Sequence, residues 1–131
     1  MALETEGKQL DEVVLRRGVE SVLADPAKGH YFVAVRSEDA RVVGQLMITF
    51  EWSDWRAGQI HWIQSVYVAP EARQTGVYRA MHEHVIAEAK RQGDVVAIRL
   101  YVERHNTTAQ RTYSRVGMKS SIYELMEQED F

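Results

Sequence analysis

The chain has 131 residues, of which 45% are hydrophobic and 27% charged, and its net charge is −3; this composition favours one globular domain over residues 1–131. It has no apolar run near the roughly 20 residues that span a bilayer and no basic stripe typical of nucleic-acid binding, so we expect neither a membrane nor a nucleic-acid partner. The absence of cysteine excludes disulfides, thiolate metal sites and a cysteine nucleophile.

The N-terminal part predicts one helix and no targeting signal. Residues Met1–Gln9 are polar and acidic, unlike a secretory signal, so we expect a cytoplasmic protein. Leu10–Leu23 carries apolar residues near the 3.6-residue period of a helix. That helix is expected to end at Asp25, because the residue before a proline disfavours helical backbone.

Three strands are expected next, and the first two form a hairpin. His30–Arg36 is rich in Tyr, Phe and Val, and Arg41–Trp52 follows it after a polar turn. Gly44, inside the second strand, indicates a bulge or a close approach of another segment. Gln59–Val68 is the third strand, and a proline follows it closely.

Helices and strands alternate in the second half of the chain. Gly76–Gln92 has apolar residues four apart, and a glycine stands directly after it as a helix cap would. Val95–Val102 is nearly all apolar or β-branched, which predicts a buried strand. Asn106–Val116 predicts a capped helix, and Met118–Met126 a final strand. This order of elements predicts an α/β (α+β) protein with a mixed sheet.

The loop between the third strand and the following helix predicts an anion site. The first turn of a helix leaves N–H groups without internal partners, and the helix dipole adds partial positive charge there. Gly76 lacks a Cβ and so lets an anion approach the backbone, while Arg73 and Arg79 can add charge-assisted contacts. Such a site suits a diphosphate; the alternative is an ordinary turn between a strand and a helix.

This loop resembles the Arg-x-x-Gly-x-Gly/Ala signature with which the GNAT superfamily of N-acetyltransferases binds the pyrophosphate of acetyl-coenzyme A. Arg73, Gly76 and Tyr78 stand at the signature positions. The sequence departs from the pattern at Gln74 and Tyr78, where many members have glycine. The resemblance implies acetyl-coenzyme A as co-substrate, with these cofactor-binding residues: Val66, Val68, Arg73, Gln74, Thr75, Gly76, Val77, Tyr78, Arg79 and Asn106.

A second segment, Asn106–Met118, is similar to the family's Asn-x-x-Ala-x-x-x-Tyr-x-x-x-Gly-Phe/Met pattern. In the family the Asn contacts the cofactor arm and the Tyr protonates the departing thiolate, and the resemblance assigns these roles to Asn106 and Tyr113. Each residue taken alone also fits a capped helix with a buried tyrosine. The two segments in this order carry the resemblance, which covers roughly residues 30–126.

The resemblance implies a GNAT-like fold, in which a mixed, mostly antiparallel sheet has helices on both faces. Gln59–Val68 and Val95–Val102 would be central, parallel neighbours that splay apart. The pantetheine arm of the cofactor would lie in the gap and pair with backbone groups of Val66 and Val68. The family's first strand has no counterpart in this sequence, which leaves His30–Arg36 as a sheet edge. Because edges invite pairing, we predict a homodimer.

The resemblance also implies the chemistry, which is transfer of an acetyl group to a primary amine by direct attack in a ternary complex. Tyr113 is predicted as the general acid, because a phenol with a pKa near 10 keeps its proton at neutral pH. Glu51 is predicted as the general base, with His61 and Glu103 as alternatives. Two other readings stay open: a non-catalytic acyl-coenzyme A-binding or regulatory module on the same fold, and an interaction domain without a cofactor.

The turn after the second strand is predicted to bind the acceptor amine. Trp52, Asp54 and Trp55 combine aromatic faces, which attract cations, with an acid; the alternative is that the Trp side chains pack beneath a loop. We expect no metal site, because His82 and His84 are two residues apart and would face different sides of a helix.

Overall fold

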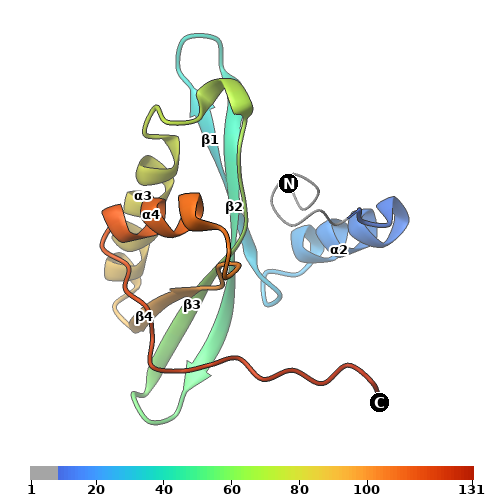
Figure 1. Cartoon of the computed structure of the whole chain (residues 1–131), viewed down its shortest axis with the longest axis vertical. Coiled ribbons are helices and arrows are strands. Elements are labelled where there is room, and N and C mark those ends of the chain that lie inside the picture. Colours follow the sequence, from blue (N-terminus) through green and yellow to red (C-terminus); the bar gives the residue numbers. More distant parts are fainter. Residues whose placement is uncertain (1–8) are drawn as a thin grey trace.

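The computed structural model describes residues 9–131. Its elements follow the predicted order of a helix, three strands, a helix, a strand and a helix (Figure 1). None of the helices in this range has the length and apolar character needed to cross a membrane. In chain order the elements are α2 (Glu12–Ala24), β1 (His30–Arg36), β2 (Arg41–Ser53), β3 (Gly58–Val68), the short 3-10 helix η1 (Pro70–Ala72), α3 (Val77–Gln92), β4 (Val95–Leu100) and α4 (Thr107–Arg115).

The four strands form one mixed sheet in the order β1-β2-β3-β4. The β1–β2 and β2–β3 pairs are antiparallel, and β3 and β4 run parallel. The parallel ladder ends where Ile63 faces Leu100, although β3 continues to Val68. The predicted fold class and the splayed parallel pair are therefore confirmed, with β4 at an edge of the sheet rather than in its centre.

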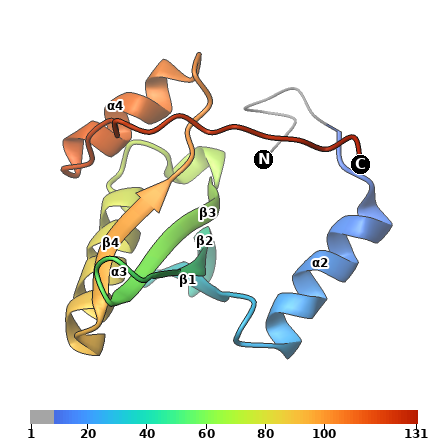
Figure 2. The same ribbon diagram turned by 90° about the horizontal axis from the view of Figure 1, so that it is seen from below.

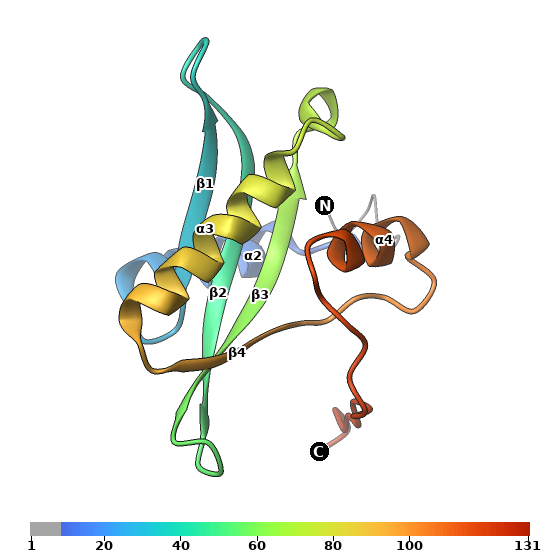
Figure 3. The same ribbon diagram turned by 90° about the vertical axis from the view of Figure 1, so that its left-hand side faces the viewer.

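The core lies between one face of the sheet and α3, which crosses the strands (Figure 3). Leu46 is fully buried at its centre, and Ile63 from β3 meets Met81 and Val85 from α3. Gly44 on β2 lets α3 approach the sheet closely, because a Cβ there would stand 2.9 Å from Val77 Cγ1. Both predicted meanings of this glycine are observed, because the β1–β2 register also shifts beside it: Ala34 pairs with Gly44 and Val35 with Val42.

The predicted final strand, Met118–Met126, is wrong. The segment beyond α4 has no regular secondary structure and runs away from the rest of the chain (Figure 1). Ile122 is 92% and Met126 93% exposed. High β-propensity makes a strand only where another strand accepts its backbone hydrogen bonds, and this segment is not paired with any strand of residues 9–131.

The N-terminal helix is confirmed, but it does not cover the sheet. α2 stands apart on the side of the sheet opposite α3, and none of its residues is buried (Figure 2). Within residues 9–131, β1 pairs with β2 alone, as the prediction that His30–Arg36 is an edge strand requires. Residues 1–8, where a family member could carry its first strand, lie outside the described residues.

Candidate active site

The turn before α3 has the open backbone that an anion site needs. Gln74 and Gly76 both adopt positive φ angles, 61° and 86°, and the helix begins at Val77. Within the described part of the chain, the backbone N–H groups of residues 74–79 donate no hydrogen bond to a backbone acceptor, and the first such bond belongs to the Ala80 N–H, which donates to the Gly76 carbonyl. Six consecutive donors are thus available to a ligand at the positive end of a 16-residue helix.

These donors border a cleft of about 490 Å³, a volume typical of small-molecule sites. Its lining contains three arginines and no carboxylate, so its charge suits an anion. The walls come from the end of β3, the Gly76 turn and one side of α4. The lining residues are Val66, Val68, Ala72, Arg73, Gln74, Gly76, Val77, Tyr78, Arg79, Thr108, Ala109, Thr112, Tyr113, Arg115 and Val116.

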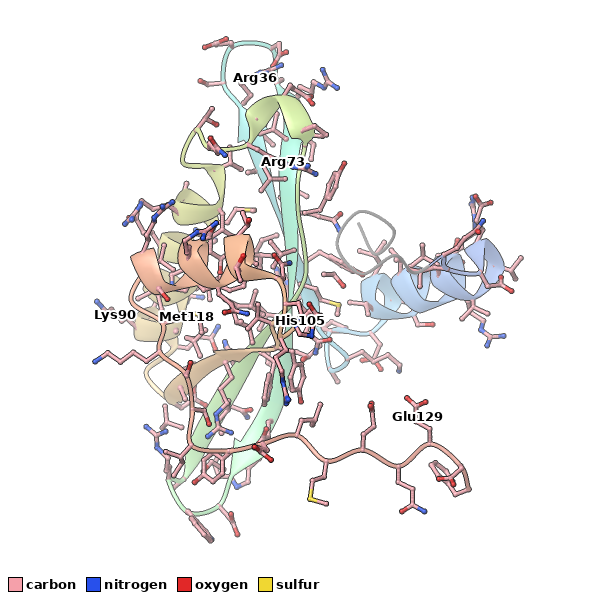
Figure 4. All side chains as sticks on the ribbon, viewed as in Figure 1. Arg36, Arg73, Lys90, His105, Met118 and Glu129 are labelled. Carbon is pink, nitrogen blue, oxygen red and sulfur yellow. The ribbon has the colours of Figure 1, made fainter. Side chains whose placement is uncertain are left out.

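Two of the arginines also hold the cleft together. Arg73 Nε donates to the Val68 carbonyl at 3.0 Å, and its guanidinium lies 5.6 Å from the centre of the Tyr67 ring, at the end of β3 (Figure 4). Arg79 Nη2 donates to the Arg115 carbonyl at 3.1 Å, which ties the first turn of α3 to the last turn of α4. The cation of Arg79 there also opposes the negative end of the α4 dipole.

The open stretch of β3 forms one side of the cleft. Beyond Ile63, β3 has no partner on the β4 side, and both Val66 and Val68 line the cleft. The two valines lie where the family resemblance predicts contact with the pantetheine arm. One of the backbone groups expected to receive that arm, the Val68 carbonyl, already accepts the Arg73 bond.

Tyr113 lies on the α4 side of the same cleft. Its ring meets the Tyr78 ring edge to face, with centres 5.2 Å apart. Burial raises the pKa of Tyr113 above its ordinary value of 10.0, so the phenol keeps its proton at neutral pH. Among the described residues its hydroxyl has no hydrogen-bond partner, yet the oxygen is not sealed from solvent. A group in the cleft can therefore take its proton.

Tyr78 and His82 form a buried pair beneath the cleft. The Tyr78 hydroxyl and His82 Nδ1 are 3.1 Å apart, one helical turn from each other on α3. Burial is the main cause that raises the pKa of Tyr78, and it also lowers the pKa of His82. Both side chains are therefore neutral at pH 7 and share one hydrogen bond, whose donor is set by the tautomer of His82.

The structure does not bring Glu51, the predicted base, to Tyr113. Glu51 Oε1 accepts from Trp62 Nε1 at 2.9 Å, and its Oε2 lies 3.9 Å from Arg99 Nη1. Glu51 pairs with Ile60 on β3, and Ile60 lies eight residues, or about 26 Å of strand, before the cleft end of β3. The pairing of β2 with β3, which the sequence does not specify, decides this separation.

The alternative bases occupy different places. His61 is only 5% exposed, its ring packs edge to face on Phe50, and burial lowers its pKa. Glu103 follows β4 just where the parallel strands separate, and one of its carboxylate oxygens accepts from the His105 N–H at 2.8 Å. Of the three candidate bases, Glu103 is the one that lies beside the point where β3 and β4 separate.

The predicted amine-binding residues lie at the other end of the sheet. Trp52 lies near the end of β2 and Asp54 and Trp55 in the turn after it, and β3 then runs its full 11 residues to reach the cleft. Trp55 is 91% exposed, so it does not pack beneath a loop. Asp54 Oδ1 accepts from the Trp55 N–H at 3.0 Å. The turn and the cleft are not brought together.

Two predicted cofactor residues shape the backbone and do not line the cleft. Asn106 Oδ1 caps α4 by accepting from the Ala109 N–H at 3.1 Å. The Thr75 hydroxyl donates to the Ala72 carbonyl and so closes the loop before Gly76. Residues 9–131 hold no group of three or more His, Cys, Asp or Glu side chains that could bind a metal ion.

Sequence reasoning missed most of the α4 side of the cleft. Thr108, Ala109, Thr112 and Val116 line it together with Tyr113. They stand at helical spacings of three and four, so one side of α4 faces the cleft. This side of α4 could have been predicted from the sequence once Tyr113 was assigned to the site, because residues three or four positions from Tyr113 lie on the same side of the helix.

Known proteins share this fold. A possible acetyltransferase from Clostridium difficile 630 is 42% identical, with a TM-score of 0.90 over 99% of this chain and 84% of that one. A probable acetyltransferase (22% identity, TM-score 0.81, 98% and 86% covered) and a ribosomal-protein-alanine N-acetyltransferase from Brucella melitensis biovar Abortus 2308 (16%, 0.71, 86% and 79%) share the fold. No match was found among proteins with curated descriptions. The profile of the Acetyltransferase (GNAT) family matches residues 3–118, and the chain therefore belongs to the GNAT family of acetyltransferases.

Proposed function

We propose that this chain transfers the acetyl group of acetyl-coenzyme A to a primary amine by direct attack within a ternary complex. The observation that carries the proposal is the meeting of three features in one cleft: the free amides of residues 74–79, the unpaired stretch of β3, and the Tyr113 hydroxyl. A nucleotide-linked thioester needs an anion site, a channel for its arm and a proton donor for its sulfur, and the cleft provides groups for each.

The cofactor would lie along the cleft with its diphosphate at the Gly76 turn. There it would receive backbone N–H donors and the charge of Arg73 and Arg79. The pantetheine arm would extend beside Val66 and Val68, where the unpaired backbone of β3 can act as the edge for an added strand. Tyr113, which lines the same cleft, would then be the residue to give a proton to the sulfur.

The acceptor must attack as a neutral amine, because its lone pair forms the new C–N bond. The tetrahedral intermediate then breaks the C–S bond, and the coenzyme A thiolate takes the proton of Tyr113. The proton lost by the amine goes to a base or through water to solvent. Glu103, at the point where β3 and β4 separate, is better placed for this step than Glu51, whose oxygens are held by Trp62 and Arg99.

A second candidate, an acyl-coenzyme A-binding module without catalysis, is favoured by two observations. No carboxylate lines the described cleft, so the base that a rapid reaction needs does not stand inside it. The predicted amine-binding turn also lies at the far end of β3. Such a module would bind the cofactor as the enzyme does and would release no thiol.

Two measurements on the purified chain test these candidates. Calorimetry with acetyl-coenzyme A should show a one-to-one complex, and a panel of amines should include acceptors that release free coenzyme A, followed by thiol titration. Binding without thiol release for any amine would favour the module. Absence of binding would overturn both candidates, because each requires an occupied Gly76 turn.

A further inference from the structure

The sheet carries a cluster of aromatic and charged side chains on the side opposite α3. Ile98 and Leu100 of β4 pack against the core, so the side chains that alternate with them, Arg99 and Tyr101, point to the other side. Trp62 pairs with Arg99 across the β3–β4 ladder, and its ring stacks on the Tyr101 ring with centres 4.6 Å apart. We call Trp62, Arg99 and Tyr101 the aromatic patch.

The aromatic patch borders the point where the two parallel strands separate. The last pair of the ladder joins Ile63 and Leu100, one position before Tyr101. The proposed cofactor cleft lies on the other side of the sheet, because Val66, which lines it, packs against the core cluster that contains α3 residues. A thioester that reaches the gap from the cleft is therefore open to attack from the side of the patch, which the bound cofactor would not fill.

Arg99 is the charged member of the patch, and its hydrogen-bond donors are not used. Its guanidinium lies 5.9 Å from the centre of the Trp62 ring and 6.0 Å from that of the Tyr123 ring. Glu51 Oε2 is 3.9 Å from Arg99 Nη1, too far for a hydrogen bond. Among residues 9–131 nothing accepts a hydrogen bond from this guanidinium, and the side chain is 37% exposed. Its planar set of five N–H donors suits a carboxylate.

Neighbouring side chains fix the position of Arg99 in advance. Trp62 Nε1 donates to Glu51 Oε1 at 2.9 Å, which holds the indole ring and the carboxylate together beside the guanidinium. Tyr123 adds a second ring, from the segment beyond α4. A ligand that binds here therefore orders little of the long arginine side chain, whose lost rotamer freedom would otherwise weaken binding.

The charges and the rings together favour a ligand with three features. Arg99 attracts an anion and repels a second cation, so a polyamine does not suit the patch. Glu103, two residues beyond Tyr101, attracts the ammonium group of an acceptor. Tyr101 is 58% exposed and continues the surface of Trp62, which gives a flat apolar wall for a side chain. A carboxylate, an amine and an apolar group on one carbon describe an α-amino acid.

We infer that the acceptor is a free α-amino acid with an aromatic side chain, whose carboxylate is bound by Arg99 and whose side chain lies on Tyr101 and Trp62. The inference rests on the proposed function and names its acceptor. The amine nitrogen forms a bond to the acetyl carbon, the C–S bond breaks, and the thiolate takes the Tyr113 proton, while the proton of the amine leaves through Glu103 or water. The products are an N-acetyl amino acid and coenzyme A.

Three acceptors that differ only at the carboxylate test this inference. Phenylalanine, phenylalaninamide and phenethylamine share the ring and the primary amine, and the first alone has a carboxylate. In the thiol-release assay, phenylalanine should have the highest kcat/KM by about tenfold or more, because it alone makes a charge-assisted contact with Arg99. Each rate is corrected for the fraction of neutral amine. A peptide N-terminus, which has no free carboxylate on that carbon, should behave like the amide.

Substitutions in the patch should act on one acceptor more than on its match. Arg99→Gln should raise KM for phenylalanine at least about ten times more than KM for phenethylamine, and turnover of phenethylamine checks that the variant folds. Arg36→Gln is the matched control, because it removes the same charge from a side chain that is 34% exposed, and it should change neither KM. Tyr101→Ala should raise KM for phenylalanine more than KM for glycine, which has no side chain to lose contact.

Calorimetry separates failure of this inference from failure of the proposed function. Phenylalanine is titrated into the complex of the protein with coenzyme A, which measures the preference for a carboxylate without turnover. If no amine releases thiol but phenylalanine binds the wild type more tightly than Arg99→Gln, the proposed transfer is wrong and the amino-acid site stands. Equal kcat/KM for the three acceptors, no binding of phenylalanine, or an equal effect of Arg99→Gln on phenylalanine and phenethylamine would overturn the inference and leave acetyl transfer to other amines standing.

Discussion

At the scale of single residues, the two glycines at the ends of α3 offer a paired experiment. Gly76 and Gly93 have φ angles of 86° and 83°, and a Cβ at either position would meet no atom within 4 Å. Alanine at each should therefore cost about 1–2 kcal/mol of stability for the left-handed backbone alone. Only Gly76→Ala adds a methyl group beside the amides proposed to hold the diphosphate.

We expect Gly76→Ala to weaken binding of acetyl-coenzyme A by at least about tenfold, and Gly93→Ala to leave it unchanged. Calorimetry gives the affinities, and chemical unfolding gives the stability loss, which should be similar for the two variants. Equal affinities would show that the diphosphate does not approach this turn.

Tyr113 should act on turnover and not on binding. Tyr113→Phe removes the proton donor and keeps the ring against Tyr78, so kcat should fall about a hundredfold while the dissociation constant of acetyl-coenzyme A stays the same. Burial raises the pKa of Tyr113 above 10.0, so its phenol should stay protonated up to about pH 10. The kcat of the wild type should therefore decline only above that pH. The variant should lack that alkaline decline, and a pH profile identical to the wild type would assign the proton to another group.

At the scale of elements, the contact of β2 with α3 positions the cofactor turn. A Cβ on Gly44 would stand 2.9 Å from Val77 Cγ1 and 3.1 Å from Met81 Cε. Gly44→Ala should cost about 1–3 kcal/mol from overpacking, and it should also weaken cofactor binding, because Val77 is the first residue of α3. Removing the clashing methyl groups in Gly44→Ala/Val77→Ala should restore part of both losses; strictly additive effects would mean that the two positions do not interact.

At the scale of the whole molecule, buried histidines should make stability depend on pH. Burial lowers the pKa of both His61 and His82 below the value of 6.5 that each has in the unfolded chain. Between the folded-state and the unfolded-state pKa of each histidine, the unfolded chain therefore binds more protons than the folded one. The stability from the neutral rings is complete above about pH 6.5 and is lost as the pH falls. The free energy of unfolding should therefore decrease from pH 7 to pH 5.

Urea unfolding at one protein concentration, repeated across that pH range, measures the effect. His82→Asn keeps a side chain that can hydrogen-bond the Tyr78 hydroxyl and removes the titrating ring, so its pH dependence should be shallower than that of the wild type. An unchanged slope would exclude His82 as a source.

The sequence by itself determined the order of the elements from α2 to α4. The strand His30–Arg36 agrees with the structure at both ends, and the helix predicted over Gly76–Gln92 differs by one residue. The Gly76 turn could be predicted because glycine positions, proline stops and helical spacing act within a few residues, whereas Tyr113 was assigned by resemblance to the family pattern.

Only the tertiary structure decided which of these parts meet. It placed Tyr113 in the cleft with the Gly76 turn, and it kept Glu51 with Trp62 and Arg99 at the other end of β3. It also left Met118–Met126 unpaired, although its composition suits a strand. Strand register and pairing depend on contacts between residues far apart in the chain, and a local pattern carries no information about which edge or which copy supplies the partner.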